Sequence, residues 1–302
     1  MTDPLTHPEP AAVSKARFLL AGLLQLLVAA VCLVGAVALY RGLVDPWIDS
    51  VFSLGAPTAS LVRRCGVFLA IVGSYWAFVR LYERRAVSEL MLRWRWILLT
   101  AAAGSLSIGV TILVLYATGR YELVAYRGFA QAGGVLAQIG VAAVLEEVAF
   151  RGILFRLLET RLGTLAALVG SSVVFMVSHL ANGGVRPVTA LTVTLAGLLW
   201  ALLFVLSRNL WVAAAHHCCW NATIFLVGVP LSGVEEWRAL APLATVDHGP
   251  RLWTGGGFGP EDSLVNLVVM TVLCLALWRL ARRATAPTAP PASVSSPPPS
   301  PA

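Results

Sequence analysis

The sequence predicts an all-α, polytopic membrane protein with about eight transmembrane helices and a polar site inside the membrane. Of its 302 residues, 58% are hydrophobic and only 12% are charged, whereas soluble domains carry about 25% charged residues. A water-soluble fold of about 300 residues leaves about a quarter of its unfolded surface exposed, so it cannot hide this much apolar surface. The apolar residues also gather in stretches long enough to cross a bilayer, and lipid is therefore the expected solvent.

Each membrane-spanning helix needs about 20 mostly apolar residues. Eight stretches meet this requirement: 18–40, 65–82, 96–117, 130–150, 162–181, 187–206, 209–229 and 263–281. The first stretch follows Lys15 and Arg17, but its 23 residues exceed the apolar core of a signal peptide, which has about 7 to 15 residues. We therefore expect it to remain in the protein as the first membrane helix.

Basic residues indicate which side of the membrane each loop occupies. The segment from Arg80 to Arg95, at the junction of the second and third stretches, carries five arginines and two glutamates, and basic loops of this kind stay in the cytoplasm. Counting helices from this loop places both termini in the cytoplasm and the acidic loop 230–262 outside. The net charge of +7 comes from 21 arginines and one lysine, so it reflects topology rather than a nucleic-acid partner. The arginine- and alanine-rich composition favours a bacterial cytoplasmic membrane.

Ionisable side chains inside the apolar stretches point to a functional site, because each costs about 2.5 to 3.5 kcal/mol to insert. Glu147 and Arg151 stand four residues apart and can pair on one helix face, whereas Glu146 points about 100° away. An unpaired acid in lipid suits a general base that takes a proton from water. The alternative is a solvated helix end. The Ala- and Gly-rich run 130–143 permits close helix packing, so it favours an interior site on a central helix.

Two further stretches carry polar groups at helical spacing. His217 and Asn221 stand four residues apart and project together, one a proton carrier and the other a neutral donor. His179 follows Phe175 by one turn, and alone it would be interpreted as a core histidine. The run from His216 to Cys219 looks like a metal cluster, but four consecutive helical residues point all around the axis and cannot converge on one ion.

Three motifs occur in order on separate stretches: Glu146-Glu147-x-x-x-Arg151, Phe175-x-x-x-His179 and His217-x-x-x-Asn221. Together they resemble the CAAX-processing and bacteriocin-immunity (CPBP, or Abi) family of intramembrane proteases, which includes the type II CAAX prenyl endopeptidase. The likeness covers roughly 129–229, and 83–90 is similar to the family's loop before its core.

The resemblance implies a division of labour among these residues. Glu146, with His179, would activate a water that attacks a peptide carbonyl. His217 and Asn221 would stabilise the oxyanion, and Glu147 and Arg151 would support them. Zinc is left open as an alternative, since Glu146, His179 and His217 could offer three ligands and an open position. No HExxH motif is present, however, so we favour a water activated by glutamate, and we expect no other cofactor.

The chain is accordingly divided into an N-terminal cytoplasmic segment (1–16), N-terminal transmembrane helices (17–128), a CPBP-like catalytic core (129–229), an extracytoplasmic loop (230–262), a last transmembrane helix (263–283) and a disordered, Pro-rich tail (284–302). One conflict remains in this scheme. Straight helices with these boundaries place His179 near the outer end of its span, too far from Glu146 and His217. Either the fifth helix is shifted or tilted, or the fourth starts later and continues to about Glu159, or a segment is re-entrant.

The leading hypothesis is an intramembrane endopeptidase, of glutamate or metallo type, that acts on a peptide or membrane-protein substrate in the lipid bilayer. A non-catalytic scaffold of the same fold that regulates a membrane partner is the first alternative. A transporter is the second, but it predicts an internal repeat or broken helices, and the sequence shows no repeat. The sequence leaves the oligomeric state open and gives no sign of a nucleic-acid partner.

Overall fold

The computed structural model describes residues 15–182 and 185–285. The N-terminal segment up to residue 14 and the Pro-rich tail from residue 286 lie outside the described residues, so the expectations for them stay untested. The regular elements are α1 (Lys15–Leu39), α2 (Asp45–Phe52), α3 (Ala56–Ala77), α4 (Trp94–Ala117), β1 (Tyr121–Tyr126), α5 (Ala132–Glu147), α6 (Arg156–Leu162), α7 (Thr164–Ser178), α8 (Pro187–Ser207), α9 (Leu210–Leu226), β2 (Leu243–Asp247), α10 (Arg251–Thr254) and α11 (Leu264–Thr285).

The predicted class of a helical, polytopic membrane protein is confirmed. Within the described part of the chain, seven helical stretches are long and apolar enough to cross a membrane. The predicted count of eight is not confirmed, because the stretch expected at 209–229 forms α9, whose 17 residues make it shorter than these seven.

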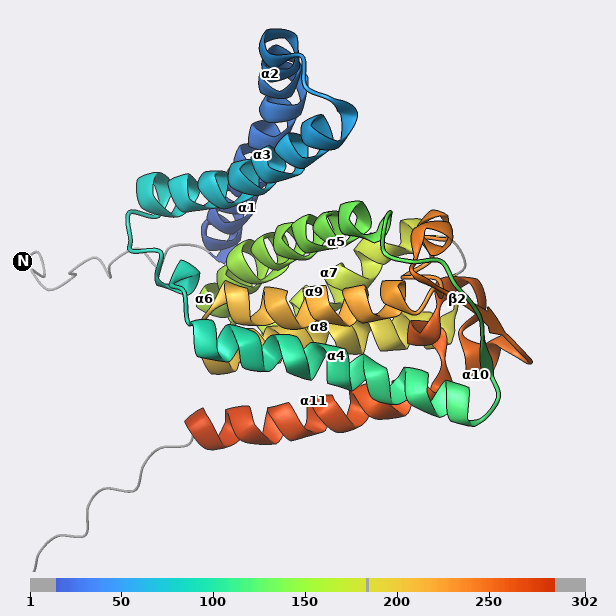
Figure 1. Cartoon of the computed structure of the whole chain (residues 1–302). Coiled ribbons are helices and arrows are strands. Elements are labelled where there is room, and N and C mark those ends of the chain that lie inside the picture. The colour runs from blue at the N-terminus through green and yellow to red at the C-terminus, as the bar shows by residue number, and fades with distance from the viewer. Residues whose placement is uncertain (1–14, 183–184, 286–302) are drawn as a thin grey trace, which may run out of the picture.

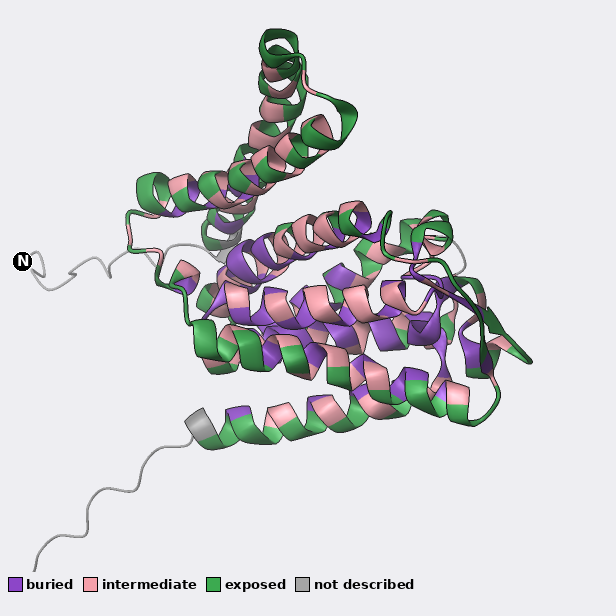
Figure 2. Ribbon diagram, viewed as in Figure 1, coloured by how far each residue is buried: buried purple, intermediate pink, exposed green. Residues whose placement is uncertain are grey.

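The helices form a bundle from which the N-terminal hairpin projects. In Figure 1, α4, α5, α8, α9 and α11 run alongside one another, while α1 and α3 lean away from them. Figure 2 shows buried residues concentrated on the inner helices and exposed residues on the outer faces of α1, α3, α4 and α11. These exposed faces are apolar, with Leu23, Leu69, Leu106 and Val268 each more than 60% exposed, which suits contact with lipid chains.

The helix that bears the two glutamates is not the most enclosed one, contrary to the expectation from its small residues. In α8, 61% of an 18-residue stretch is buried, against 33% for the helical run Ala132–Leu162. Gly133, in the small-residue run, has no atom within 4 Å of the position where a side chain would begin. The central position therefore belongs to α8, and the glutamates lie at the end of α5, which packs against α9 and α3.

The fourth predicted stretch continues well beyond its expected end at residue 150. A π-helical segment, Val148–Phe155, joins α5 to α6 without a break, and the whole run ends at Leu162. Of the three explanations for the depth of His179, the structure supports a fourth helix that starts later and runs past Glu159. Glu147 lies 16 residues before the turn at Gly163 and His179 lies 16 residues after it, so the two helix arms bring both residues to a similar depth.

A two-stranded antiparallel sheet, which the all-α prediction lacked, covers one end of the bundle. Strand β1 pairs with β2, with Tyr121 opposite Asp247 and Tyr126 opposite Leu243, and a bulge lies between Leu123 and Ala125. The sheet ties the connection before α5 to the segment 230–262. This segment therefore packs back onto the bundle, where it can contribute to a site.

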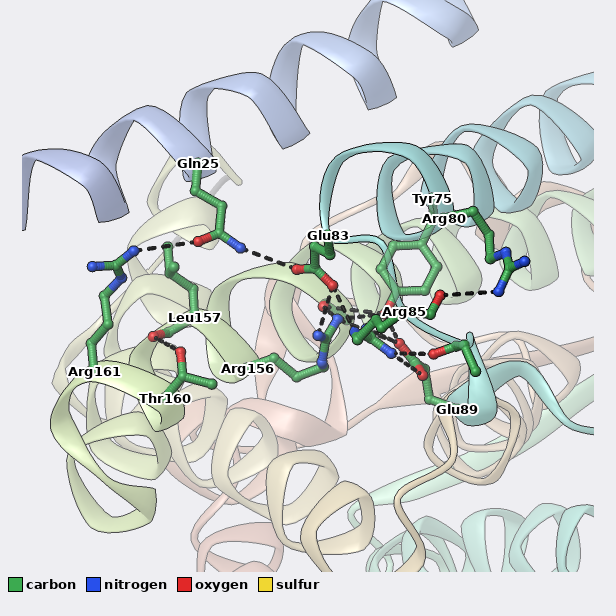
Figure 3. A network of polar contacts seen from close by, with 12 residues as sticks. Gln25, Tyr75, Arg80, Glu83, Arg85, Glu89, Arg156, Leu157, Thr160 and Arg161 are labelled. Atoms are coloured by element: carbon green, nitrogen blue, oxygen red, sulfur yellow. Dashed lines mark hydrogen bonds and ion pairs between the residues drawn. The ribbon is translucent and has the colours of Figure 1, made fainter.

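A polar network joins the N-terminal hairpin to the other end of the bundle (Figure 3). Glu83 accepts hydrogen bonds from Gln25 on α1 at 3.1 Å and from Arg156 on α6 at 2.8 Å. Glu89 accepts from Arg85 at 2.5 Å and from the Tyr75 hydroxyl. These bonds act together with the apolar packing of Ile71 and Tyr75 on α3 against Val148 and Ile153, and both attach the hairpin to the bundle.

Candidate active site

The predicted site residues surround one cavity of about 240 Å³. Glu146 lies at the end of α5, His179 in the turn that follows α7, and His217 and Asn221 one turn apart on α9. All four line the cavity. The cavity also has an aromatic lining that includes Phe175 from α7 and Trp200 from α8.

Glu147 lies beneath the cavity and holds two neighbours at once. Its Oε1 accepts a hydrogen bond from the Arg151 guanidinium at 3.0 Å and another from Nδ1 of His217 at 3.0 Å. Glu147 and Arg151 are both fully buried, and Arg151 also donates to the carbonyl oxygen of Gly197 on α8 at 2.7 Å. The expected pairing of Glu147 with Arg151 is confirmed, and it extends to the histidine on α9.

His217 is fixed in both position and ring orientation. Its ring stacks on Trp200 with centroids 3.6 Å apart and an angle of 16° between the planes. Since an ionised carboxylate only accepts, Nδ1 of His217 carries the proton that it donates to Glu147. The other ring nitrogen, Nε2, lies 3.8 Å from Oε2 of Glu146. The aromatic stack and the buried carboxylate together leave Nε2 as the nitrogen that can act in the cavity.

Glu146 differs from Glu147 in its exposure to solvent and in its hydrogen bonding. Its side chain is 30% exposed, against 1% for Glu147. Its Oε2 is shielded from solvent and has no hydrogen-bond partner among the described residues. This is the arrangement of a carboxylate available to a bound molecule.

His179 reaches the cavity because the last turn of α7 tightens. Its Nδ1 donates to the carbonyl oxygen of Phe175 at 2.9 Å, and its ring lies against the Phe175 ring with centroids 4.5 Å apart. In the neutral ring, Nε2 is then an acceptor. His179 can therefore accept a hydrogen bond from a water or a substrate group.

The Asn221 amide has no hydrogen bond to protein within the described ranges, although it lines the cavity. The four-residue spacing from His217 places it one turn further along the same face of α9. An amide in this position can offer an N–H donor to a ligand.

Residues 128–223 match the family model described as "Rce1-like: Type II CAAX prenyl endopeptidase Rce1-like". This core of the chain is similar to the type II CAAX prenyl endopeptidase family. The Rce1-like segment contains Glu146, His179, His217 and Asn221. No curated protein and no solved structure matches the chain.

The cavity has one acidic residue that sequence reasoning missed, and it lies beyond the Rce1-like segment. Glu261 lines the cavity and is only 8% exposed. Its Oε2 accepts from the backbone N–H of Ser232 at 2.9 Å and from the Ser232 hydroxyl at 2.6 Å, and its Oε1 accepts from the Trp220 indole at 3.3 Å. Burial raises the pKa of Glu261, which these hydrogen bonds and the nearby His179 partly oppose. No sequence pattern separates this residue from the four other acids of the segment 230–262.

The zinc alternative and the glutamate-activated water use the same three residues, Glu146, His179 and His217. In the described part of the chain, no group of three or more His, Cys, Asp or Glu residues is arranged to hold a metal ion. The Nδ1 atoms of His179 and His217 both make hydrogen bonds, which leaves Nε2 of each ring as the nitrogen that faces a bound molecule. The neighbouring His216 accepts from the Trp200 indole at 3.1 Å, so the run from His216 to Cys219 does not converge on a metal either.

Proposed function

We propose that the protein is an intramembrane endopeptidase that hydrolyses a peptide bond with a water activated by Glu146. The observation that carries this proposal is the single cavity of about 240 Å³ lined by Glu146, His179, His217 and Asn221. The match of residues 128–223 to a family of endopeptidases supports the reaction class. We propose a membrane-associated or small peptide as the substrate.

Glu146 acts as the general base. The water sits between Glu146 and His179, whose Nε2 accepts one of its hydrogen bonds. As the water oxygen attacks the carbonyl carbon, its proton moves to the Glu146 carboxylate and the carbonyl electron pair moves onto oxygen. Glu146 then returns the proton to the amide nitrogen as the C–N bond breaks, which yields a carboxylic acid and an amine.

Asn221 and His217 stabilise the negative oxygen of the tetrahedral intermediate. Hydrogen-bond donors held in place before the reaction are among the largest contributors to catalysis of acyl transfer. Asn221 donates through its amide. His217 donates through Nε2 only when both ring nitrogens carry protons, because its Nδ1 proton is held by Glu147.

The test compares cleavage by wild type with cleavage by E146Q, H179A, H217A and N221A, using full-length protein in membrane vesicles. Peptide products are identified by mass spectrometry. We expect E146Q to lose about 100-fold or more of the cleavage rate, which is a typical contribution of a general base. H179A, H217A and N221A should each lose cleavage at normal protein levels.

Cys218→Ser is the matched control, because Cys218 follows His217 on α9 but does not line the cavity. It should cleave like wild type. Unchanged products from E146Q, H179A and H217A would overturn the proposal and leave the alternative of a regulatory scaffold with this fold.

A further inference from the structure

One wall of the cavity comes from the segment that follows the family match. The lining residues of this wall are Leu231, Ser232, Val234, Trp237 and Glu261, whereas the match ends at residue 223. The residues proposed for chemistry and the residues of this wall therefore belong to different parts of the chain. Since the wall faces the same cavity, it contacts whatever substrate the cavity holds.

Hydrogen bonds to the bundle fix the wall in place. Glu261 joins the Ser232 segment to Trp220 on α9, as described above. From the other side, the Asn182 amide, three residues after His179, donates to the carbonyl oxygen of Ser232 at 2.8 Å. The wall is thus held by both elements that carry the proposed catalytic histidines.

Arginine partners are unevenly distributed among the acids at the cavity. Glu146 and Glu261 line it, and the acid next to each along the chain is paired with arginine: Glu147 with Arg151 at 3.0 Å, and Asp262 with Arg186 at 2.9 Å. Glu146 and Glu261 have no arginine or lysine at ion-pair distance within the described ranges. No arginine or lysine lines the cavity.

We propose that Glu261 is a specificity-determining residue that binds a positively charged nitrogen of the substrate next to the scissile bond. The nitrogen comes from a lysine side chain or from a free amino terminus. This inference rests on the proposed function, because it takes the substrate to be a peptide in the cavity of Glu146.

Two observations favour a cation over a neutral group. The pKa of Glu261 is raised by burial, which means that the ionised carboxylate lacks the solvation it has in water. A bound cation supplies that missing stabilisation. Trp237 lies in the same wall, and an indole ring adds attraction for a cation at close range.

The test measures peptide selectivity rather than total activity. Full-length protein in vesicles is given pairs of apolar peptides that differ only by lysine against norleucine, or by a free against an acetylated amino terminus. We expect wild type to prefer one cationic member by about tenfold or more in kcat/KM, as expected for a close charge pair. E261Q should cleave both members at similar rates, while E261D, which keeps the charge, should retain a preference.

E236Q is the matched control, because Glu236 is an exposed acid of the same segment that does not line the cavity. It should select like wild type. Because Gln and Asp both disturb the bonds to Ser232 and Trp220, a contrast between E261Q and E261D reports charge rather than structure. Equal preference in wild type and E261Q, or no preference in wild type, overturns the inference.

Binding separates this inference from the proposed function. In the E146Q background, fluorescence anisotropy of labelled peptides should show tighter binding of the cationic member, and E146Q/E261Q should bind both alike. If wild type cleaves no peptide but E146Q still binds with charge preference, the proposed reaction fails and the assignment of Glu261 holds. If wild type cleaves peptides without a charge preference, the proposed reaction holds and the assignment of Glu261 fails.

Discussion

Two adjacent residues of the same type, Glu146 and Glu147, have different surroundings because a helix turns about 100° per residue. Glu147 is enclosed by Arg151 and His217, and Glu146 faces the cavity. The enclosed pair is not fully satisfied, since Oε2 of Glu147 and Nε of Arg151 lack partners among the described residues. Such buried pairs add little net stability. The more direct role of the Glu147–Arg151 pair is to position His217.

Glu147→Gln should therefore reduce both stability and cleavage. Loss of the carboxylate leaves the Arg151 charge buried without its counter-ion, which costs about 3 kcal/mol or more. Cleavage should fall less than in E146Q, because the glutamine amide oxygen can still accept from Nδ1 of His217. Thermal unfolding in detergent and the vesicle cleavage assay measure the two effects.

The control for this substitution is Glu122→Gln. Glu122 also pairs with a histidine, His248, at 2.8 Å, but its side chain is 64% exposed. Its replacement should change stability by less than about 0.5 kcal/mol. If Glu147→Gln is equally mild, Glu147 does not balance a buried charge and its proposed supporting role is wrong.

At the scale of elements, the decisive feature is the length of the run Ala132–Leu162. The sequence prediction ended this helix at residue 150 and kept a continuation to about Glu159 as one of three alternatives. The structure shows why the helix continues: Arg151 is bound by Glu147 and Gly197, and Arg156 by Glu83. The partners Gly197 and Glu83 lie on other elements and leave no local pattern, so the sequence could not decide how far the helix continues.

We expect the turn at Gly163 to set the depth of His179 in the bundle. It ends α6 and begins α7 with φ at 84° and ψ at 167°, a conformation essentially restricted to glycine. No atom lies within 4 Å of a methyl group added there, so Gly163→Ala adds only backbone strain, about 1 to 3 kcal/mol. We expect a lower unfolding temperature and slower peptide cleavage, because the α6–α7 turn sets how far α7 reaches.

Gly109→Ala provides the comparison for this turn. Gly109 lies inside α4, also with no atom within 4 Å of the added methyl group, and its backbone is helical. Alanine there should be neutral or stabilising by up to about 1 kcal/mol. Equal behaviour of the two variants would show that the turn tolerates a side chain and that the strain argument is incorrect.

At the scale of the whole molecule, contacts between residues close in the sequence could be predicted, and contacts between residues far apart in the sequence could not. The pairing of Glu147 with Arg151 and the shared face of His217 and Asn221 follow from four-residue spacing, and both were predicted. Glu261 meets Trp220 and Ser232 only after α9 and the segment 230–262 have folded back, and β1 pairs with β2 across more than 100 residues. Contacts of this kind leave no periodic signal, so one wall of the site and the small sheet were missed.

The contribution of the network around Glu89 to stability can be tested through its pH dependence. Burial opposes ionisation of Glu89, but hydrogen bonds from Arg85 and Tyr75 outweigh it and lower the pKa of this carboxyl group to about 2 from its ordinary value of 4.5. A carboxylate with a lowered pKa stabilises the fold fully above the unfolded pKa, and this contribution is lost as the pH falls through the folded pKa. Wild type should therefore lose the stabilisation between about pH 4.5 and pH 2.

Glu89→Gln should remove that stabilisation at neutral pH, by about 2 kcal/mol for hydrogen bonds to charged groups. The gap in unfolding temperature between wild type and E89Q should be wide at pH 7 and should narrow steadily as the pH approaches 2. Glu235→Gln is the control, because Glu235 pairs with Arg238 at 3.1 Å with a side chain that is 58% exposed, and it should show almost no gap. A gap for E89Q that does not change with pH would mean that packing, rather than the charge of Glu89, ties the N-terminal hairpin to the bundle.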